Sequence, residues 1–268
     1  MKVTKGWAVV TGASSGIGLE FARQLARRGH PVLAIARRRE RLVGLAKEAA
    51  EHGGWIESLS ADLATEEGLA LVSRRVDELA EIELLINNAG VATAGDFVGA
   101  SLDREIAEIK LNVEAVVRLT QRVLGPMVKR QHGAVINLAS VVGFQPFPHF
   151  AVYAATKAFV ISFTEALAEE LKGTGVRILA LCPGSVRTEI DVFAHNEGLL
   201  GKLPSLTAEQ VVRTGLRTLE NGRVIKVVGG LNQFLPFMGR IMPRQTMRWL
   251  MGVSVKPAGT RSTEKVRT

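Results

Sequence analysis

Short apolar runs alternate with amphipathic segments along most of this chain. Each apolar run is bounded by glycine, proline or polar residues, which indicates a buried β-strand. We expect strands at Trp7–Thr11, Pro31–Ala36, Trp55–Ser60, Leu84–Asn87, Val135–Ala139, Val176–Cys182 and Val224–Val228.

Between these runs, apolar residues recur every three or four positions, as on a helix with one buried face. We expect helices from Ile17, over 39–52, Thr65–Leu79, Leu102–Lys129 and 152–171, and from a capping box at Thr207 to Asn221. Strands and helices alternate without a repeat or a linker. The pattern predicts an α/β fold, a single-domain doubly wound parallel sheet of about seven strands with helices on both faces.

A glycine-rich turn joins the first strand to the first helix. Gly12, Gly16 and Gly18 have the spacing G-x-x-x-G-x-G, which differs from the G-x-G-x-x-G fingerprint. Glycines let a backbone turn tightly and approach a pyrophosphate, and the helix N-terminus faces its negative charge. A plain turn is the alternative, but the position between a strand and an amphipathic helix favours a dinucleotide site and a Rossmann-like sheet.

The end of the second strand indicates which dinucleotide fits. An NAD site usually has an acidic residue here for the ribose 2′-hydroxyl, whereas this chain has Ala36 followed by three arginines. Arginine suits a 2′-phosphate, so NADP(H) is predicted, mainly through Arg37 and with help from Arg38, and NAD(H) stays possible. The other interpretation, a solvated helix face, fits Arg39 better. Asp62 could accept from an adenine amino group or cap the next helix.

The segment from Val135 to Ala158 carries the candidate chemistry. Its strand delivers Ser140, and the helix that follows places Tyr153 and Lys157 four residues apart on one face. A positive charge beside a phenol favours the phenolate, so Lys157 is expected to lower the pKa of Tyr153 and make it a general acid/base. A Tyr-x-x-x-Lys pair can also be a solvated surface pair. Tyr153 is the chain's only tyrosine.

Composition narrows the classes further. The chain has 268 residues, 47% apolar content and a formal net charge of +8. The basic residues are spread over helices with one tyrosine for stacking, so nucleic-acid binding is not expected. One cysteine permits no internal disulfide, and the five histidines have no metal-ligand spacing, so no metal is expected. No signal peptide or membrane span is expected either, which predicts a cytoplasmic protein.

These motifs, in this order and spacing, resemble the short-chain dehydrogenase/reductase family over roughly Val3 to Val228. The resemblance rests on TGASSGIG at 11–18, NNAG at 87–90, Asn112, Ser140, Tyr153-x-x-x-Lys157, and Pro183-Gly184 with Thr188. It implies that Tyr153 is the acid/base, that Lys157 holds the nicotinamide ribose, that Ser140 orients the substrate carbonyl and that Asn112 supports a water in the proton relay. NADP-preferring members often carry a basic residue in the glycine loop, where this chain has two serines.

The resemblance also implies the cofactor contacts. They are Gly12, Ser14, Ser15, Gly16, Ile17, Gly18, Arg37, Arg38, Asp62, Leu63, Asn88, Ala89, Gly90, Tyr153, Lys157, Pro183, Gly184, Val186 and Thr188. Asn112 sits within a predicted helix, where asparagine is either a tolerated surface position or the place of a functional kink. The implied assembly is a homodimer or homotetramer built on the helices around 102–129 and 152–171.

The substrate is expected to be a small apolar ketone, aldehyde or secondary alcohol. Its candidate wall residues are all apolar: Phe144, Phe147, Phe193, Leu199 and Leu200. Two other functions stay open, a catalytically silent cofactor-sensing binding protein and a reductase of lipid or steroid type lying on a membrane surface. Such membrane contact is the less favoured reading.

Residues 1–230 are expected to form the dinucleotide-binding catalytic domain, and 231–268 an extension that packs on it. Arg240, Arg244 and Arg248 recur every four residues in this extension among large apolar side chains. Pro243 suits a helix start, so two short helical pieces are expected, over the substrate cleft or a neighbouring subunit. From Val253 the chain is polar and expected to be mobile.

Overall fold

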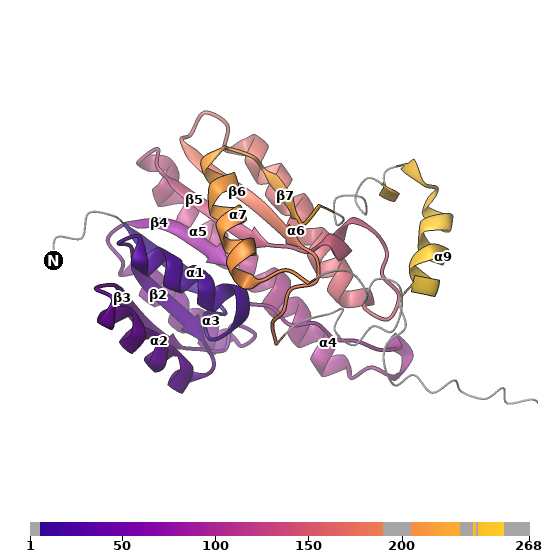
Figure 1. The fold of residues 1–268 in the computed structure, drawn as a ribbon, viewed down its shortest axis with the longest axis horizontal. Coiled ribbons are helices and arrows are strands. Elements are labelled where there is room, and N and C mark those ends of the chain that lie inside the picture. Colours follow the sequence, from indigo (N-terminus) through magenta and orange to yellow (C-terminus); the bar gives the residue numbers. More distant parts are fainter. Residues whose placement is uncertain (1–5, 190–204, 231–237, 240, 255–268) are drawn as a thin grey trace, which may run out of the picture.

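The computed structural model describes residues 6–189, 205–230, 238–239 and 241–254. Its centre is a seven-stranded sheet in the order β3-β2-β1-β4-β5-β6-β7, with every neighbouring pair parallel (Figure 1). The strands are β1 (Trp7–Thr11), β2 (Pro31–Ala36), β3 (Trp55–Ser60), β4 (Ile82–Asn87), β5 (Gly133–Leu138), β6 (Val176–Pro183) and β7 (Ile225–Val228). The predicted fold class is confirmed.

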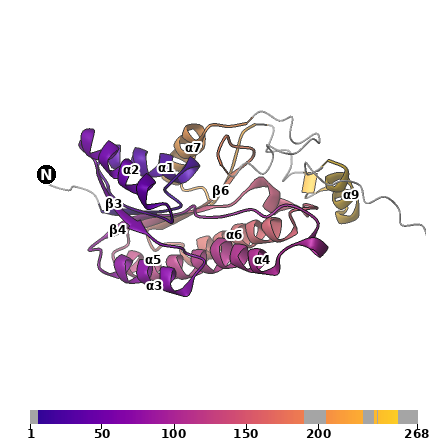
Figure 2. The same ribbon diagram turned by 90° about the horizontal axis from the view of Figure 1, so that it is seen from below.

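Helices cover both faces of the sheet, as Figure 2 shows edge-on. One layer holds α1 (Gly16–Arg27), α2 (Arg39–Glu51) and α7 (Ala208–Glu220). The other holds α3 (Glu66–Asp77), α4 (Leu102–Ile109), α5 (Ala115–Lys129) and α6 (Ala151–Glu170). A separate hydrophobic cluster lies under each layer, one around Phe21 and Leu216 and the other around Leu85 and Leu119.

The central strands are continuous apolar runs because both of their faces are covered. All six residues of β2 and all six of β5 are buried. Parallel strands packed on two sides read in this way, without the alternation of a half-exposed strand. All seven strands run in the same direction, so their carboxyl ends lie along one edge of the sheet.

The segment predicted as one helix over Leu102–Lys129 is divided in the structure. A π-helical turn at Lys110–Glu114 separates α4 from α5, and the buried Asn112 lies in its middle. A π turn inserts one residue into the helical ladder and is frequent at functional sites. The segment is helical from Leu102 to Lys129 as predicted, and the burial of Asn112 excludes the surface alternative. The π turn interrupts the regular helix where the kink was expected, and a functional role for it stays a prediction.

Helix α6 bears on the expectation that the chain has no membrane span. It is the one helix in the described part of the chain that is long and apolar enough to cross a membrane. Its buried face includes Tyr153 and Lys157 and packs against β5 and β6. A core helix between a sheet and neighbouring helices passes the same length and composition test, and the contacts of α6 are those of a core helix.

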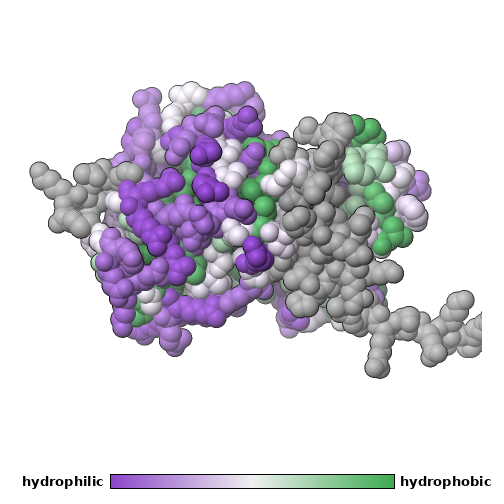
Figure 3. All heavy atoms as spheres, in the orientation of Figure 1, coloured by the Kyte–Doolittle hydropathy of each residue, from purple (hydrophilic) through white to green (hydrophobic). Residues whose placement is uncertain are grey.

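The tail helix α9 (Arg244–Ser254) begins directly after Pro243, as predicted. It continues two residues into the stretch expected to be polar and mobile, because Met247, Met251 and Ser254 are buried on one face. Its other face is exposed, with Trp249 67% accessible, and hydrophobic atoms gather at the surface around this helix in Figure 3.

Candidate active site

A cavity of about 430 Å³ lies at the carboxyl edge of the sheet. It is lined by residues that follow β1, β2, β3, β4, β5 and β6, and by one face of α6. The lining contains these predicted site residues: Gly12, Ser14, Ser15, Gly16, Ile17, Arg37, Arg38, Asp62, Leu63, Asn88, Ala89, Gly90, Ser140, Tyr153, Lys157, Pro183, Gly184, Val186 and Thr188. Gly18 and Asn112 lie behind this lining and shape it.

The glycine loop needs its glycines for close packing. A Cβ at Gly18 would lie 2.3 Å from Asn88 Nδ2 and 2.4 Å from the Gly12 carbonyl oxygen. Gly12 has φ +68°, and Gly16 has φ +55° with a Cβ position 2.9 Å from Thr188. The loop therefore holds its backbone against the strand ends in a conformation that other residues rarely adopt.

The start of α1 fits a dinucleotide. No side chain caps its N-terminus, and Gly16 and Ile17 of the first turn line the cavity. Uncapped backbone N–H groups at a helix start carry partial positive charge that suits a pyrophosphate. The helix start, the glycine backbone and the arginines of β2 thus supply what a phosphorylated dinucleotide requires.

The residues after β4 are fixed by the same loop. Asn88 Nδ2 donates to the carbonyl oxygen of Thr11 at 2.9 Å, and the Thr11 hydroxyl accepts from the backbone N–H groups of Asn88 and Ala89 at 2.9 Å. These bonds hold the backbone of Ala89 and Gly90 along the floor of the cavity. Small residues there leave room for a flat ligand.

Arg38 lies closer to the glycine loop than the sequence suggested. Its guanidinium donates to Ser14 Oγ at 3.0 Å and to Ser15 Oγ at 2.7 Å. Arg37 instead lies 3.7 Å from the Asp62 carboxylate, and its side chain is 67% exposed. Successive residues of an extended segment point to opposite sides, so one arginine faces the end of β1 and the other the end of β3. Arg38 thus lies at the glycine loop and Arg37 at the Asp62 side, while the prediction that Arg37 is the main phosphate ligand stays a prediction.

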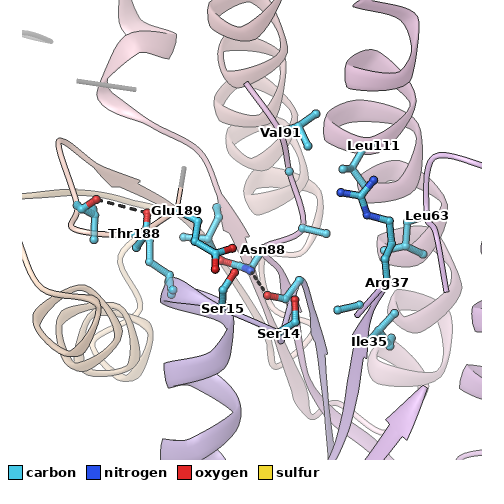
Figure 4. Close-up of a pocket in the computed structure, with 18 of the residues that line it drawn as sticks. Ser14, Ser15, Ile35, Arg37, Leu63, Asn88, Val91, Leu111, Thr188 and Glu189 are labelled. Atoms are coloured by element: carbon cyan, nitrogen blue, oxygen red, sulfur yellow. Dashed lines mark hydrogen bonds between the residues drawn. The ribbon is translucent and has the colours of Figure 1, made fainter. Parts of the chain in front are cut away.

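Glu189 is a site residue that the sequence reading missed. Its carboxylate pairs with Arg38 at 2.6 Å and with Arg41, and these hydrogen bonds lower the pKa of Glu189 to about 2. Figure 4 shows Glu189 beside Ser15 and Asn88, with Arg37 across the cavity next to Leu63. Glu189 follows β6, so only the fold brings it to the arginines.

Asp62 was expected either to accept from an adenine amino group or to cap the next helix. One carboxylate oxygen accepts from the backbone N–H of Ala64 at 3.0 Å, which is a local turn contact. The cap of α3 is Thr65, whose hydroxyl accepts from the Gly68 N–H at 3.0 Å. Asp62 therefore does not cap the helix, and its remaining oxygen faces Arg37.

Ser140, Tyr153 and Lys157 meet at the inner end of the cavity. All three are buried, with exposures of 6%, 8% and 6%. Burial raises the pKa of Tyr153, while a hydrogen bond from Ser140 lowers it and the charge of Glu108 raises it. The net shift of the Tyr153 pKa is upward because the cost of burying a phenolate dominates, and the lowering expected from Lys157 stays a prediction.

Lys157 is held by the strand below it. Its Nζ donates to the Leu138 carbonyl oxygen at 2.8 Å and lies 5.7 Å from the centre of the Tyr153 ring. Burial lowers the pKa of Lys157 to about 8, against the opposing charge of Glu108. Both members of the pair are thus shifted by desolvation toward their neutral forms.

Asn112 ties the π turn to the cavity floor. Its Nδ2 donates to the Val91 carbonyl oxygen at 2.9 Å and to Thr156 Oγ1 at 3.1 Å, and its Oδ1 accepts from the Val91 N–H at 3.0 Å. A Cβ on Gly90 would lie 3.0 Å from Asn112 Oδ1 and 3.6 Å from Lys157 Nζ. The amide of Asn112 and the ammonium of Lys157 therefore face each other across Gly90.

A second cavity of about 660 Å³ lies between residues 143–148, α6 and α9. Of the apolar side chains predicted as substrate walls, Phe144 and Phe147 line this cavity and not the first one. Phe193, Leu199 and Leu200 lie outside the described residues. Gln145 also lines the second cavity, and neither atom of its buried amide has a hydrogen-bond partner.

The sequence matches a known family. Residues 6–197 match the family model of the short chain dehydrogenases. The chain is 40% identical over 186 residues to a short chain dehydrogenase of Pseudocercospora fijiensis, a match that covers 68% of this chain and 60% of that relative, under two thirds of its length. It is 39% identical over 184 residues to a putative ketoacyl reductase of Streptomyces coelicolor, covering 68% of this chain and 70% of the relative.

Solved structures agree with the sequence match. A short-chain dehydrogenase from Sphingobium yanoikuyae in complex with NADPH is similar with a TM-score of 0.78 and 33% identity, over 96% of this chain and 99% of the other. A bulky-bulky ketone specific alcohol dehydrogenase from Comamonas testosteroni is similar with a TM-score of 0.76 and 30% identity, over 90% and 96%. The chain therefore belongs to the short-chain dehydrogenase family and is an oxidoreductase that acts on CH–OH or C=O groups.

Proposed function

We propose that this protein transfers a hydride between NADP(H) and an apolar, bulky ketone, or the corresponding secondary alcohol. The observation that carries the proposal is one cavity with two ends. Buried Tyr153 lies at the inner end with Ser140 and Lys157, and Arg38 lies beside the glycine loop at the other. Reduced nicotinamide would supply the hydride, and the side chains at the inner end would supply the proton.

In the reducing direction, Tyr153 gives its phenolic proton to the substrate oxygen as the carbon accepts the hydride. Ser140 donates a hydrogen bond to the same oxygen, which holds the carbonyl in place and stabilises the developing negative charge. Lys157 stabilises the phenolate that Tyr153 becomes, because a nearby ammonium offsets the cost of a buried anion. In the oxidising direction, the phenolate accepts the alcohol proton.

Support for NADP(H) comes from the charge around Arg38 and from a relative. The solved Sphingobium yanoikuyae relative contains NADPH. In this chain β2 ends in Ala36 and not in an acidic residue, and the Arg38 guanidinium reaches both serine hydroxyls of the glycine loop. A 2′-phosphate beside this guanidinium would gain a charge-assisted hydrogen bond.

Support for an apolar, bulky substrate comes from the second cavity. Its walls are mostly aromatic, alanine, proline and methionine side chains, and three of them, Phe147, Ala154 and Met247, share a hydrophobic cluster with Tyr153. One solved relative is specific for bulky-bulky ketones. A substrate with two large apolar substituents could place one of them on this side of Tyr153.

We also propose a homo-oligomer in which α4 and α6 contribute contacts. Leu102 and Ile106 on α4 are 68% and 43% exposed, and Phe159 on α6 is 38% exposed. Light scattering after size-exclusion chromatography measures the mass of the assembly, and a monomer at micromolar concentration would contradict the proposal.

The test of the function is a substrate screen with both cofactors. Loss of NADPH or NADH absorbance is followed with bulky aryl ketones, ketosteroids, 3-oxoacyl thioesters and small ketones such as acetone. We expect turnover of bulky apolar ketones with NADPH, and turnover lower by at least roughly 100-fold with the Tyr153→Phe variant. A protein that binds NADPH but turns over no member of the panel in either direction would be a binding protein instead.

A further inference from the structure

A buried carboxyl lies behind the inner end of the cavity and has no part in the proposed chemistry. Glu108, on α4, is 0% exposed, which is rare for a glutamate without a cationic partner in contact. Its Oε2 accepts from the Thr93 backbone N–H at 2.9 Å, and its Oε1 lies 3.4 Å from Asn112 Nδ2. Glu108 is thereby connected to the residue that faces Lys157 across Gly90.

A second carboxyl reaches the same threonine. The Thr93 hydroxyl oxygen lies 3.0 Å from Glu105 Oε2 and 2.5 Å from Glu108 Oε2. Glu105 is 8% exposed, so both carboxyls are shielded from bulk solvent. They stand at positions i and i+3 on α4, on its inner side.

The number of hydrogens available for these contacts bears on the protonation of Glu105 and Glu108. A threonine hydroxyl has one hydrogen to donate and can accept others. The Thr93 backbone N–H serves Glu108, but the one hydroxyl hydrogen cannot lie in both Oγ1 contacts at once. Two like charges that share a buried site also favour keeping one proton between them. Both Oγ1 contacts are satisfied together when one of the two carboxyls is a carboxylic acid that donates to the Thr93 oxygen.

We propose that Glu105 and Glu108 hold one proton between them across the Thr93 hydroxyl and that this pair controls the protonation of Tyr153 and Lys157. The inference rests on the proposed acid/base role of Tyr153. Glu108 is a positioning residue here, because it acts on the reaction through the field at the other two side chains.

The directions of the pKa shifts at Glu108, Tyr153 and Lys157 show that these groups are coupled as the proposal requires. Burial raises the pKa of Glu108 and outweighs the hydrogen bonds from the Thr93 hydroxyl and N–H, which lower it. The charge of Glu105 raises this pKa, and the charge of Lys157 lowers it. An ionised Glu108 in turn raises the pKa of both Tyr153 and Lys157. The charged and titratable groups around Glu108 are thus Glu105 on its own helix and Tyr153 and Lys157 on α6. A proton on Glu108 makes Tyr153 the stronger acid, and a proton on Glu105 makes it the weaker.

Two isosteric variants separate this control from a structural role, because they should shift the pKa of Tyr153 in opposite directions. Glu108→Gln removes the charge nearest Tyr153, so the pH limb of kcat/KM that reports Tyr153 should move down by about half a unit to one unit. Glu105→Gln removes the like charge that keeps Glu108 protonated, so the same limb should move up. Thr93→Val, which removes the bridging hydroxyl, serves as the third variant.

The measurement is the pH profile of kcat/KM for NADPH-dependent reduction and for alcohol oxidation, at saturating cofactor. A direct readout is available because the chain has a single tyrosine. Protein labelled with [ζ-¹³C]tyrosine, in complex with NADP⁺, gives one resonance whose titration should shift with the kinetic limb. The shift should appear in both readouts for each glutamine variant.

The proposal would be overturned if the Tyr153 limb of the kcat/KM profile lay at the same pH in wild type and in both glutamine variants. A fall in kcat alone would not rescue it, since a merely structural role lowers rates at every pH. Should Glu108→Gln not fold, Glu105→Gln decides alone: an upward shift supports the proposal and an unmoved limb overturns it. Failure of the acid/base assignment is distinguishable, because Tyr153→Phe would then keep its activity.

Discussion

Arg38 and Glu189 form an ion pair of 2.6 Å although 151 residues separate them in the chain. Arg38 follows β2 at the glycine-loop end of the cavity, and Glu189 follows β6. The same guanidinium also donates to the glycine-loop serines. One side chain therefore joins three strand ends, and the cofactor phosphate we propose would compete with Glu189 for it.

The first prediction concerns cofactor preference. Arg38→Ala should lower kcat/KM with NADPH by roughly ten- to a hundredfold and leave NADH nearly unchanged, because a charge-assisted hydrogen bond contributes roughly 1.5–3 kcal/mol and about 1.4 kcal/mol is one factor of ten. Arg38 is 41% exposed, so screening favours the lower end of this range. Steady-state kinetics with both cofactors, at low and high salt, measure the effect.

Arg39→Ala is the matched control, since it removes the neighbouring exposed arginine of the same stretch. It should leave both cofactors unaffected. Glu189→Gln should strengthen NADPH selectively by removing the competing carboxylate. A wild type that prefers NADH would refute the assignment of this end of the cavity.

The second prediction concerns the acid/base. Tyr153→Phe keeps the ring in its hydrophobic cluster and removes the proton donor. Turnover should fall by roughly 100- to 10,000-fold, the range for general acid/base groups. Titration of NADPH fluorescence should show nearly unchanged cofactor binding. Lys157→Ala should impair both binding and turnover, and a Phe variant with most of its activity would be incompatible with the role given to Tyr153.

The sequence predicted the fold well because buried parallel strands leave an unambiguous pattern. Each predicted strand overlaps an observed one, and the errors are at the ends: β4 begins at Ile82, two residues before the predicted start. The predicted cofactor residues after β1, β4 and β6 line one cavity because parallel strands share a carboxyl edge.

What the sequence could not give are contacts between distant side chains. Glutamate on an amphipathic helix normally indicates the solvent face, so nothing in the pattern marks Glu108 as buried. Which of Arg37 and Arg38 turns toward the glycine loop depends on backbone geometry at the end of β2. Glu189 is recognised as a site residue only from the fold, which brings it to Arg38. The one local signal was Asn112, whose poor helix propensity coincides with the π turn.

The third prediction compares two glycines. Gly18→Ala should destabilise the protein and weaken NADPH binding, because its Cβ would lie 2.4 Å from the Gly12 carbonyl oxygen and must displace the loop. Gly44→Ala, within α2 and with nothing within 4 Å of its Cβ position, should raise the free energy of unfolding by about 0.5–1 kcal/mol. Urea unfolding with and without NADPH measures both, and a stabilising Gly18→Ala would contradict the packing described.

The last prediction tests whether the extension beyond residue 230 packs on the catalytic domain. Met247 is 2% exposed and lies in one hydrophobic cluster with Phe147, Phe150 and Tyr153, whereas Trp249 on the same helix is 67% exposed. If α9 folds together with the domain, Met247→Ala should lower the free energy of unfolding by about 2–5 kcal/mol, the usual result of emptying a core position. It should also lower kcat, because the same cluster supports Tyr153. Trp249→Ala removes a larger side chain from the surface and should stay within about 0.5 kcal/mol of wild type. Urea unfolding of the two variants gives the comparison directly. Equal, small effects would mean that α9 contributes nothing to the folded domain, and the packing of the extension over the Tyr153 side of the site would have to be abandoned.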